Sequence, residues 1–493
     1  MVASEATPLV KTGGLADVVG ALPKALREQG HEVAVVLPRY RSISLDGAVL
    51  RWQNLAVHLG PYTYLCGLWE KQVAGTRFFF VDCPELFDRP GLYNSGGEDY
   101  LDNHRRFAVF CHGALAVLRY LFQANVIHLH DWQAALCAAY LRTRLSMDPL
   151  LGRVKIVYTI HNLDYQGRFN LGQFAELGLD RWLMHPDLME FYGDVSFMKG
   201  GIAFADAITT VSPRYSLEIQ TPEFGSGLDG FLRAHAHKLT GILNGCDYSE
   251  WDPRVDTYIV RNYDAETLER FQTDRGLPLA DGADRTYNEN ALEAKQACKL
   301  DLLIALGLDE RNAGLPVLGM VTRLAHQKGI DIFAAIAGEL LTTDDVCLAV
   351  LGSGDPALED FMRRLAIDFP GRVSGKIGYD NKLAHQIEAG SDLFLMPSRF
   401  EPCGLNQMYS LRYGTVPIVR ATGGLDDTVD EETGFKFAGY DPRDFLAAIR
   451  LALAEFRNDP PAWRSRMQRG MAKDYSWGAS AASYSGMFRR LTG

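Results

Sequence analysis

The sequence of 493 residues contains no apolar run of the roughly 18 residues that a membrane span requires. It also lacks the basic-then-apolar start of a signal peptide, so we expect a protein that neither enters a membrane nor leaves the cytoplasm. Its eight cysteines are scattered without any Cys-x-x-Cys pair, which is typical of reduced, buried thiols. Basic residues are not in excess, because the formal net charge is −11. This charge argues against general nucleic-acid binding and requires that any anionic ligand find a local basic pocket.

Two motifs that would indicate a bound metal or cofactor are also missing. No Asp-x-Asp triplet is present to hold a divalent ion on a diphosphate. No Gly-x-Gly-x-x-Gly follows a strand with an acidic residue about 20 positions further on, which disfavours a nicotinamide-dependent oxidoreductase. His128, His130 and Asp131 are a candidate metal cluster, but alternation along a strand places the two histidines on one face and Asp131 on the other. We therefore expect no metal and no cofactor.

The residues that are present alternate between short apolar runs and helical stretches. Near-continuous apolar strands of this kind are typical of parallel sheets covered on both faces, so we predict an α/β protein with two doubly wound, Rossmann-like domains. We place the domain boundary near Asn244–Asp247, which gives residues 1–244, completed by a helix at 477–493, and residues 245–476. The polar stretch 271–290 is expected to form a surface loop. The predicted strands are 33–38, 78–83, 125–131, 154–162, 207–213 and 240–245 in the first half, and 316–324, 346–354, 372–379, 392–398 and 415–424 in the second.

One short motif occurs twice, as KTGGLADVVGAL at residues 11–22 and as ATGGLDDTV at residues 421–429. At the first copy, Gly13 and Gly14 allow a tight turn and the close approach of a ligand, and an apolar helical face follows until Gly30. Only Met1–Ala3 stand before Ser4, where a doubly wound sheet needs a strand. We therefore expect a short or frayed first strand and a shortened start of the chain. A purely structural Gly-Gly loop is the alternative interpretation.

Polar residues follow many of the predicted strands, at the edge where open α/β sheets bind their ligands. These are Asp131, His161, Asn162 and Asn244 in the first half, and Arg323, Lys328, Gly352–Gly354, Tyr379, Glu401 and Thr422–Gly424 in the second. Arg323 and Lys328 lie five apart directly after a strand, and two buried cations suit a diphosphate whose charge grows as it leaves. Solvated surface charge is the alternative for such a pair. His161 alone is also compatible with a satisfied core histidine, Glu401 with a helix cap, and Trp132 and Tyr165 with either sugar stacking or core packing.

Six blocks of this sequence together resemble the family of bacterial glycogen synthases and plant starch synthases. They are KTGGLADVVGALPKAL, HLHDWQAAL, YTIHNLDYQG, LNGCDYSEWDP, TRLAHQKGID and PSRFEPCGLNQMYSLRYGTVPIVRATGGLDDTV. The resemblance extends from Ser4 to the final helix. It implies the GT-B fold, two Rossmann-like domains with a C-terminal helix that crosses back to the first, and transfer of glucose from ADP-glucose to the non-reducing end of an α-1,4-glucan with retention of configuration.

The same resemblance implies roles for individual residues. Arg323 and Lys328 would hold the diphosphate and stabilise the departing ADP, while Lys11, Gly14 and Asp17 would approach the donor from the other domain. His161 would lie near the transferred glucose, with Asn162 and Asn244 also at the substrate, and Asp131 near the reacting centre. The remaining expected contacts are Glu401, Cys403, Gly404 and Leu405 with the sugar, Tyr379 with the adenine, and Gly354 and Thr422, Gly423 and Gly424 with the donor.

Two positions depart from related patterns. Many retaining GT-B enzymes carry a second glutamate eight residues after the first, where this chain has Tyr409, as is usual for the glycogen synthase branch; many family members have His where this chain has Gln133. A GT-B transferase that uses UDP-glucose and a catalytically silent glucan-binding protein are the alternatives. The sequence leaves the oligomeric state open.

Overall fold

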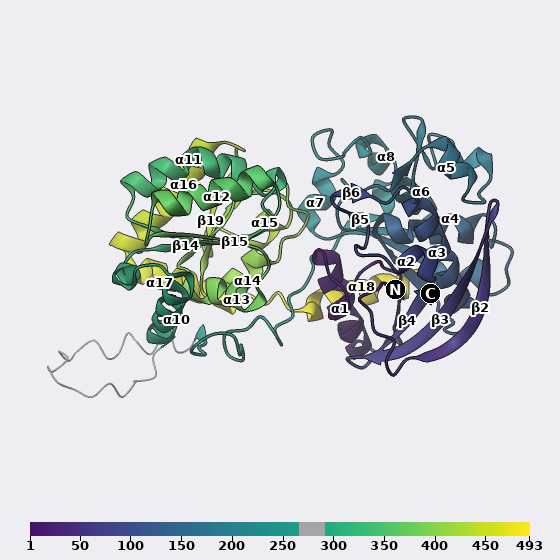
Figure 1. The fold of residues 1–493 in the computed structure, drawn as a ribbon, viewed down its shortest axis with the longest axis horizontal. Helices are drawn as coiled ribbons and strands as arrows, with labels where there is room; N and C mark the ends of the chain where they lie inside the picture. Colours follow the sequence, from purple (N-terminus) through teal and green to yellow (C-terminus); the bar gives the residue numbers. More distant parts are fainter. Residues whose placement is uncertain (266–290) are drawn as a thin grey trace. The chain divides into compact units, whose positions relative to one another are not determined.

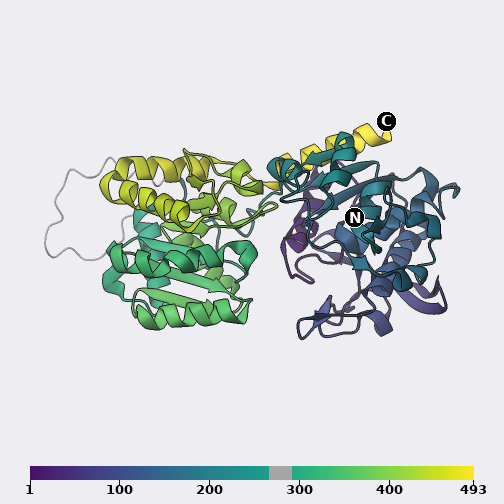
Figure 2. The same ribbon diagram turned by 90° about the horizontal axis from the view of Figure 1, so that it is seen from above.

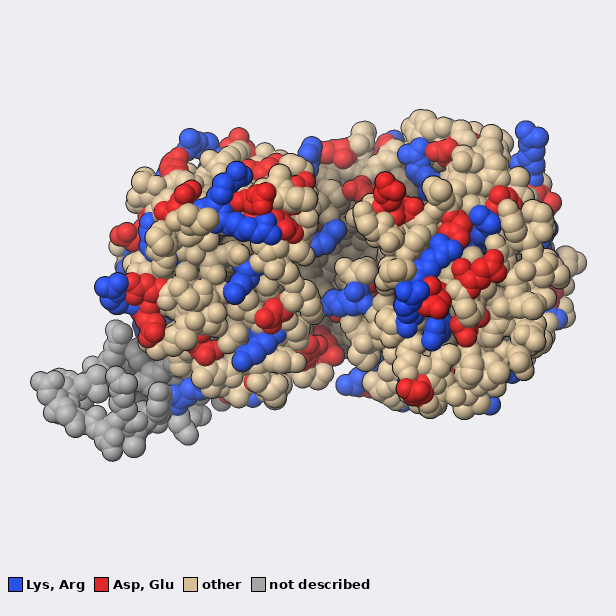
Figure 3. Space-filling view, viewed as in Figure 1, with Lys and Arg blue, Asp and Glu red and all other residues tan. Residues whose placement is uncertain are grey.

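The computed structural model describes residues 1–265 and 291–493, apart from the side chains of 291–293, and divides the chain into two units. Unit 1 contains Met1–Gly245 and Trp477–Gly493, and unit 2 contains Cys246–Ser476 (Figure 1). The polar stretch predicted to be a loop, 271–290, lies outside the described residues. No helix in the described ranges is long and apolar enough to cross a membrane. Figure 3 shows acidic and basic side chains interspersed on the visible face of each unit.

Unit 1 is built around two four-stranded sheets that a single residue joins. Their strand orders are β1-β4-β3-β2 and β13-β12-β8-β7. Val2 forms parallel bridges to both Leu129 and Val36, so the predicted short first strand is confirmed as one paired residue between the two halves. The strands are β1 (Ala34–Pro38), β2 (Val49–Leu59), β3 (Tyr62–Val73), β4 (Thr76–Asp82), β7 (Val126–His130), β8 (Lys155–Ile160), β12 (Ala207–Thr210) and β13 (Leu239–Gly241).

The sheet of unit 1 is not parallel throughout, because β2 and β3 pair antiparallel with each other and β3 pairs antiparallel with β4. This hairpin was not predicted from the sequence, because β2 is largely exposed and carries no continuous apolar run. Shorter strands are β5 (Asn94–Ser95), β6 (Glu98–Asp99), β9 (Arg168–Phe169), β10 (Glu190–Phe191) and β11 (Asp194–Ser196).

Helix α1 (Gly14–Glu28) shows why the first motif continues as a helix. Its apolar side chains, at the predicted spacing, are all buried: Leu15, Val18, Val19, Leu22, Ala25 and Leu26. Gly30 follows with φ +88°, a left-handed conformation that ends the helix as predicted. The other helices of the unit are α2 (Pro84–Phe87), α3 (Asn103–Tyr120), α4 (Asp131–Arg142), α5 (Leu171–Ala175), α6 (Phe197–Phe204), α7 (Pro213–Glu218) and α8 (Asp229–Ala234), with short 3-10 turns at Leu151–Arg153, Arg181–Leu183 and Ala236–Lys238.

The last helix, α18 (Trp477–Thr492), belongs to unit 1 although the chain reaches it from unit 2 (Figure 2). Its apolar side chains pack against α1, and Ala481 and Tyr484 are fully buried there with Val18 and Leu22. The expected return of the C-terminal helix to the first domain is therefore confirmed.

Unit 2 contains one parallel sheet of six strands in the order β16-β15-β14-β17-β18-β19. The strands are β14 (Val317–Val321), β15 (Cys347–Gly352), β16 (Val373–Ile377), β17 (Leu393–Met396), β18 (Val416–Arg420) and β19 (Phe435–Phe437). The first five correspond to the predicted strands, and β19 was not predicted because it has only three residues.

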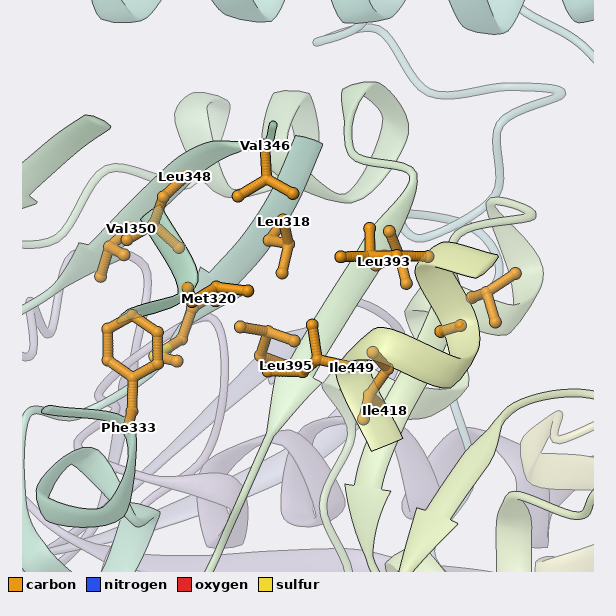
Figure 4. Close-up of a cluster of buried hydrophobic side chains, with 14 of the residues drawn as sticks. Leu318, Met320, Phe333, Val346, Leu348, Val350, Leu393, Leu395, Ile418 and Ile449 are labelled. Atoms are coloured by element: carbon orange, nitrogen blue, oxygen red, sulfur yellow. The ribbon is translucent and has the colours of Figure 1, made fainter. Parts of the chain in front are cut away.

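Helices cover both faces of this sheet, as the near-continuous apolar strands require. On one face Leu318, Met320 and Leu348 pack with Phe333 and Ile449 of the covering helices (Figure 4). On the other face the alternate strand residues pack against α10 and α13. The helices are α10 (Ala291–Leu306), α11 (Ile330–Thr343), α12 (Pro356–Asp368), α13 (Asn381–Gly390), α14 (Asn406–Arg412), α15 (Gly423–Thr428), α16 (Pro442–Asn458) and α17 (Pro460–Ala472), with 3-10 turns at Glu310–Gly314 and His326–Lys328.

Candidate active site

The loops at the carboxyl edge of the unit 2 sheet are tied to one another by backbone hydrogen bonds. Leu324, after β14, pairs with Gly354 after β15, and the N–H of Gly378 after β16 donates to the carbonyl of Gly352 over 3.0 Å. Further along the edge, the N–H of Arg399 donates to the carbonyl of Gln327 over 2.8 Å. The predicted residues of unit 2 therefore lie on one connected rim, as expected for the ligand edge of an open α/β sheet.

Lys328 and Glu401 form the central ion pair of this rim. The Nζ of Lys328 lies 2.6 Å from Oε2 of Glu401, and their side chains are 18% and 6% exposed. The hydroxyl of Ser398 donates to the same carboxylate oxygen over 3.0 Å. Because one Glu401 oxygen receives both bonds, the arrangement fixes a cation beside a carboxylate at the edge of the sheet.

The expectation that both cations are buried is wrong for Arg323. Its side chain is exposed, and its Nη2 donates to Oε1 of Gln327 over 2.9 Å. The physical reason is its position: Arg323 comes second after the end of β14, beyond the cover of the helices, whereas Lys328 lies in the turn that leads back into α11. Arg323 is therefore a surface guanidinium held beside the rim, and Lys328 is the partly buried cation.

The second Gly-Gly motif packs directly beneath the Glu401 loop. The N–H of Gly424 donates to the carbonyl of Glu401 over 3.1 Å. A Cβ on Gly423, whose φ is +46°, would lie 1.8 Å from the same carbonyl oxygen, and one on Gly424 would lie 2.1 Å from the carbonyl oxygen of Cys403. Only glycine permits this approach of two backbones. Thr422 beside them is buried.

The first motif uses its glycines differently. Gly13 has an extended backbone, and a Cβ built on Gly13 or Gly14 would meet nothing within 4 Å. The expected tight turn is therefore not what these two glycines provide. Both instead leave open space above the start of α1, where a ligand can approach the backbone.

Residues 403–405 form the turn that leads from Glu401 into α14. Cys403 is buried, Gly404 has φ +72°, and Leu405 precedes the first residue of the helix. The side-chain amide of Gln407 donates to the carbonyls of Cys403 and Gly404, over 3.1 Å in each case. These bonds and the glycine hold the turn in one conformation.

Two tyrosines of unit 2 have opposite environments. Tyr379, at the end of the β16 loop, is 80% exposed, so its ring is available to a planar ligand. Tyr409, at the position of the second glutamate in other GT-B enzymes, is buried and stacks on Trp251 with ring centroids 4.1 Å apart and planes 5° apart. Trp251 also stacks on His385 at 3.7 Å. Tyr409 therefore packs in the interior of unit 2.

In unit 1, Lys11 and Asp17 of the first motif pair with each other. The Nζ of Lys11 lies 2.7 Å from Oδ1 of Asp17, with side chains 43% and 24% exposed. Glu5, which was not among the predicted residues, is buried and accepts hydrogen bonds from the backbone and hydroxyl of Thr12 and from the hydroxyl of Tyr93. The available signal was a carboxylate three residues after Val2, the paired residue of the first strand. Glu5 fixes the loop that carries Lys11.

Asp131 and His161 meet where β7 and β8 end side by side. Asp131 begins α4 with φ +56°, an uncommon conformation for a non-glycine residue. Its Oδ1 accepts the backbone N–H of His161 over 2.7 Å. Burial raises the pKa of Asp131 to about 7, although the backbone N–H groups of His161 and Asn162 act in the opposite direction. Burial also lowers the pKa of His161 to about 3, so its imidazole is neutral at physiological pH.

The remaining predicted residues of unit 1 are divided between the interior and the surface. His128 and His130 share a strand face, as predicted, with rings 4.1 Å apart, and Asp131 turns to the loop instead. In the described ranges, no group of three or more His, Cys, Asp or Glu residues is arranged to hold a metal ion. Trp132 is buried against Phe107, so this ring takes part in core packing, the second of the two predicted alternatives. Tyr165, in contrast, is 55% exposed. Asn244 is buried in the loop after β13.

Known proteins match this chain along its whole length. Residues 1–234 match the family model described as the starch synthase catalytic domain, and residues 315–455 match glycosyl transferases group 1. Glycogen synthase of Koribacter versatilis is 46% identical over 98% of this chain and 96% of its own, and that of Moorella thermoacetica is 41% identical over 99% and 96%. The chain belongs to the glycogen and starch synthase family. As a member, it is a hexosyltransferase of the glycogen synthase type.

Solved structures of this family and beyond it establish the fold. The catalytic domain of starch synthase IV from Arabidopsis thaliana, bound to ADP and acarbose, matches with a TM-score of 0.87 and 32% identity over 100% of this chain and 98% of its own. Sucrose-phosphate synthase from Thermosynechococcus elongatus matches with a TM-score of 0.59 and 17% identity over 99% and 98%, and so shares the fold. This chain therefore has the GT-B fold.

Proposed function

We propose that this enzyme transfers glucose from ADP-glucose to the 4-hydroxyl at the non-reducing end of an α-1,4-glucan such as glycogen, with retention of the anomeric configuration and release of ADP. The starch synthase IV structure was solved with ADP and acarbose, a nucleotide and an oligosaccharide analogue, which supports this pair of substrates. The observation that carries the proposal is the partly buried Lys328–Glu401 pair beside the close-packed Gly423–Gly424 turn.

Unit 2, residues 245–476, binds the donor in this proposal. Departure of ADP leaves negative charge on the diphosphate, and a cation fixed in advance at that position lowers the barrier. Lys328 is held in place by Glu401, and exposed Arg323 can rotate from Gln327 onto a phosphate. The two positive charges act on the leaving group without a metal ion.

The rest of the rim fits the sugar and the base. Glu401, Cys403, Gly404 and Leu405 line the turn that would hold the transferred glucose, and Thr422 with the two glycines would contact phosphate. The exposed ring of Tyr379 would pack on the adenine, beside Gly354 at the end of the neighbouring strand.

Unit 1, residues 1–244 with 477–493, supplies the acceptor side in this proposal. His161 would contact the transferred glucose, Asn162 and Asn244 would lie at the substrate, and Asp131 would hold the His161 backbone in place. Lys11, Gly14 and Asp17 would approach the donor from the open start of α1.

Retention can result from a covalent intermediate or from attack on the same face. We place the reaction in the cytoplasm, because the eight cysteines are free and buried.

The test is incubation with glucose-labelled ADP-glucose or UDP-glucose and glycogen, with label counted in polymer and in free glucose. The proposal expects label in polymer from ADP-glucose, in a product that an α-1,4-specific hydrolase digests. Preference for UDP-glucose would support the related GT-B transferase, and absence of transfer from either donor would support a silent glucan-binding protein. Either outcome would overturn the proposal.

A further inference from the structure

His130 contacts His161 in the interior of unit 1. The Nδ1 of His130 lies 3.0 Å from the Nε2 of His161, and the two rings come from the ends of the neighbouring strands β7 and β8. His130 is fully buried and His161 is 8% exposed. One of these two nitrogens must carry the proton of the hydrogen bond, because two bare nitrogens would repel each other.

Both imidazoles are neutral, so each ring carries one proton. Burial, and then the neighbouring His128 and His161, holds the pKa of His130 well below its ordinary value. Burial alone lowers the pKa of His161 to about 3. Each ring therefore has one N–H donor and one bare acceptor nitrogen, and the position of one proton fixes the position of the other.

The surroundings of His130 decide which nitrogen is protonated. Its Nε2 is buried and has no hydrogen-bond partner within residues 1–265 and 291–493. A proton there would be a buried, unpaired N–H, and among backbone groups such orphaned donors are rarer than under-satisfied acceptors. The proton of His130 therefore belongs on Nδ1, which donates to Nε2 of His161.

The consequence appears on the other side of the His161 ring. Because Nε2 of His161 accepts, the single proton of that ring stands on Nδ1, which has no hydrogen-bond partner in the described part of the chain. We propose that His130 is a positioning residue that fixes the tautomer of His161, so that His161 presents an N–H donor, and never a bare nitrogen, to a hydroxyl oxygen of the transferred sugar. This inference rests on the proposed function for the identity of the sugar.

The stack behind His130 keeps its ring in this orientation. The ring of His128 lies 4.1 Å from that of His130, and its Nε2 bonds the hydroxyl of Thr159 over 2.6 Å. On its outer side, His128 contacts Tyr484 and Phe488 of α18, at 5.2 and 5.8 Å between ring centroids. The C-terminal helix thus supports a packed series of rings that ends at His161.

Two substitutions of nearly equal polarity separate this role from simple packing. His130→Asn places an amide N–H close to the position of Nδ1, whereas His130→Gln places it close to that of Nε2. We expect His130→Asn to keep kcat within about threefold of the parent enzyme. We expect His130→Gln and His130→Leu to lower kcat about 10- to 100-fold, by analogy with the loss of the outer partner of a metal-binding histidine, with little change in the KM for glycogen. His112→Phe, at another buried histidine of unit 1, is the control for lost packing and should keep full kcat.

The tautomer can also be read directly from the unsubstituted protein, with one variant used only to assign its signals. Two-bond ¹H–¹⁵N correlation of the unsubstituted protein, labelled in histidine and assigned with His161→Asn, should show His161 protonated on Nδ1 and bare on Nε2. The opposite tautomer, or equal kcat for the Asn, Gln and Leu variants at position 130, would overturn the inference. Failure of the proposed function would give a distinct result, because the unsubstituted protein itself would then transfer no label in the labelled-donor assay.

Discussion

Removal of the Lys328 cation gives two separable effects, one on folding and one on turnover. The pair distance of 2.6 Å and the exposures of 18% and 6% describe a mostly buried ion pair. Breaking such a pair from one side costs about 3–5 kcal/mol, because the remaining charge is left buried. Ser398 still donates to Glu401 and some water reaches the site, so we expect Lys328→Met to cost about 2–3 kcal/mol, or a decrease in Tm of roughly 4–12 °C. We expect kcat to fall about 10²-fold or more, as when one preorganised electrostatic donor is lost.

The double variant Lys328→Met/Glu401→Gln separates these effects. It removes both charges and leaves a neutral amide that accepts from Ser398, so its unfolding free energy should return to within about 1 kcal/mol of the parent value. Its kcat should stay as low as that of Lys328→Met, because the leaving group still lacks the cation. The assays are calorimetric melting and initial rates of label transfer to glycogen. Recovery of kcat together with stability, or full turnover by Lys328→Met alone, would refute the assignment of Lys328 to the departing diphosphate.

Three further predictions follow from the geometry of the two motifs, the exposed ring and the buried carboxyl. Gly424→Ala should cost about 1–3 kcal/mol by overpacking against the carbonyl of Cys403, whereas Gly14→Ala should leave the Tm unchanged and raise the KM for ADP-glucose; equal Tm losses would contradict this contrast. Tyr379→Ala should raise that KM about 5- to 150-fold, the equivalent of about 1–3 kcal/mol of base stacking, at unchanged Tm, while Tyr379→Phe should match the parent; a KM unaffected by Tyr379→Ala would exclude stacking on the base. The carboxyl of Asp131 has a folded-state pKa of about 7 against an ordinary value of 3.8, so the folded state holds its proton more tightly and stability is lost as pH rises from about 4 to 7. Asp131→Asn should remove this loss, at most about 4 kcal/mol above pH 7, and denaturant titrations that show the same pH slope for both proteins would show that Asp131 is not the responsible group.

Much of the fold could be predicted because buried parallel strands produce continuous apolar runs. The five longest strands of unit 2 are of this kind. The hairpin of β2 and β3 could not be predicted in this way, since β2 faces solvent over most of its length. The first strand was predicted to be short because only three residues precede Ser4, and in the structure it consists of the single paired residue Val2.

The positions of site residues along the chain were predictable, but their environments were not. Strand ends located Lys328 and Glu401, yet nothing in the spacing indicated that they form an ion pair or that Arg323 is exposed. The two Gly-Gly motifs look alike in sequence. Only the structure shows that Gly424 packs against a backbone carbonyl while Gly14 faces open space. Such differences depend on neighbours that are distant in the sequence.

The central claim is that the enzyme holds the diphosphate of its donor with the side chains of Arg323 and Lys328. Calorimetric titration of ADP into the full-length protein, in excess EDTA, tests it most directly. We expect ADP to bind the unsubstituted protein without a divalent ion and to bind Arg323→Ala and Lys328→Met each at least about tenfold more weakly, the equivalent of about 1.4 kcal/mol per charge. Binding that requires added magnesium, or equal affinity in all three proteins, would contradict the claim.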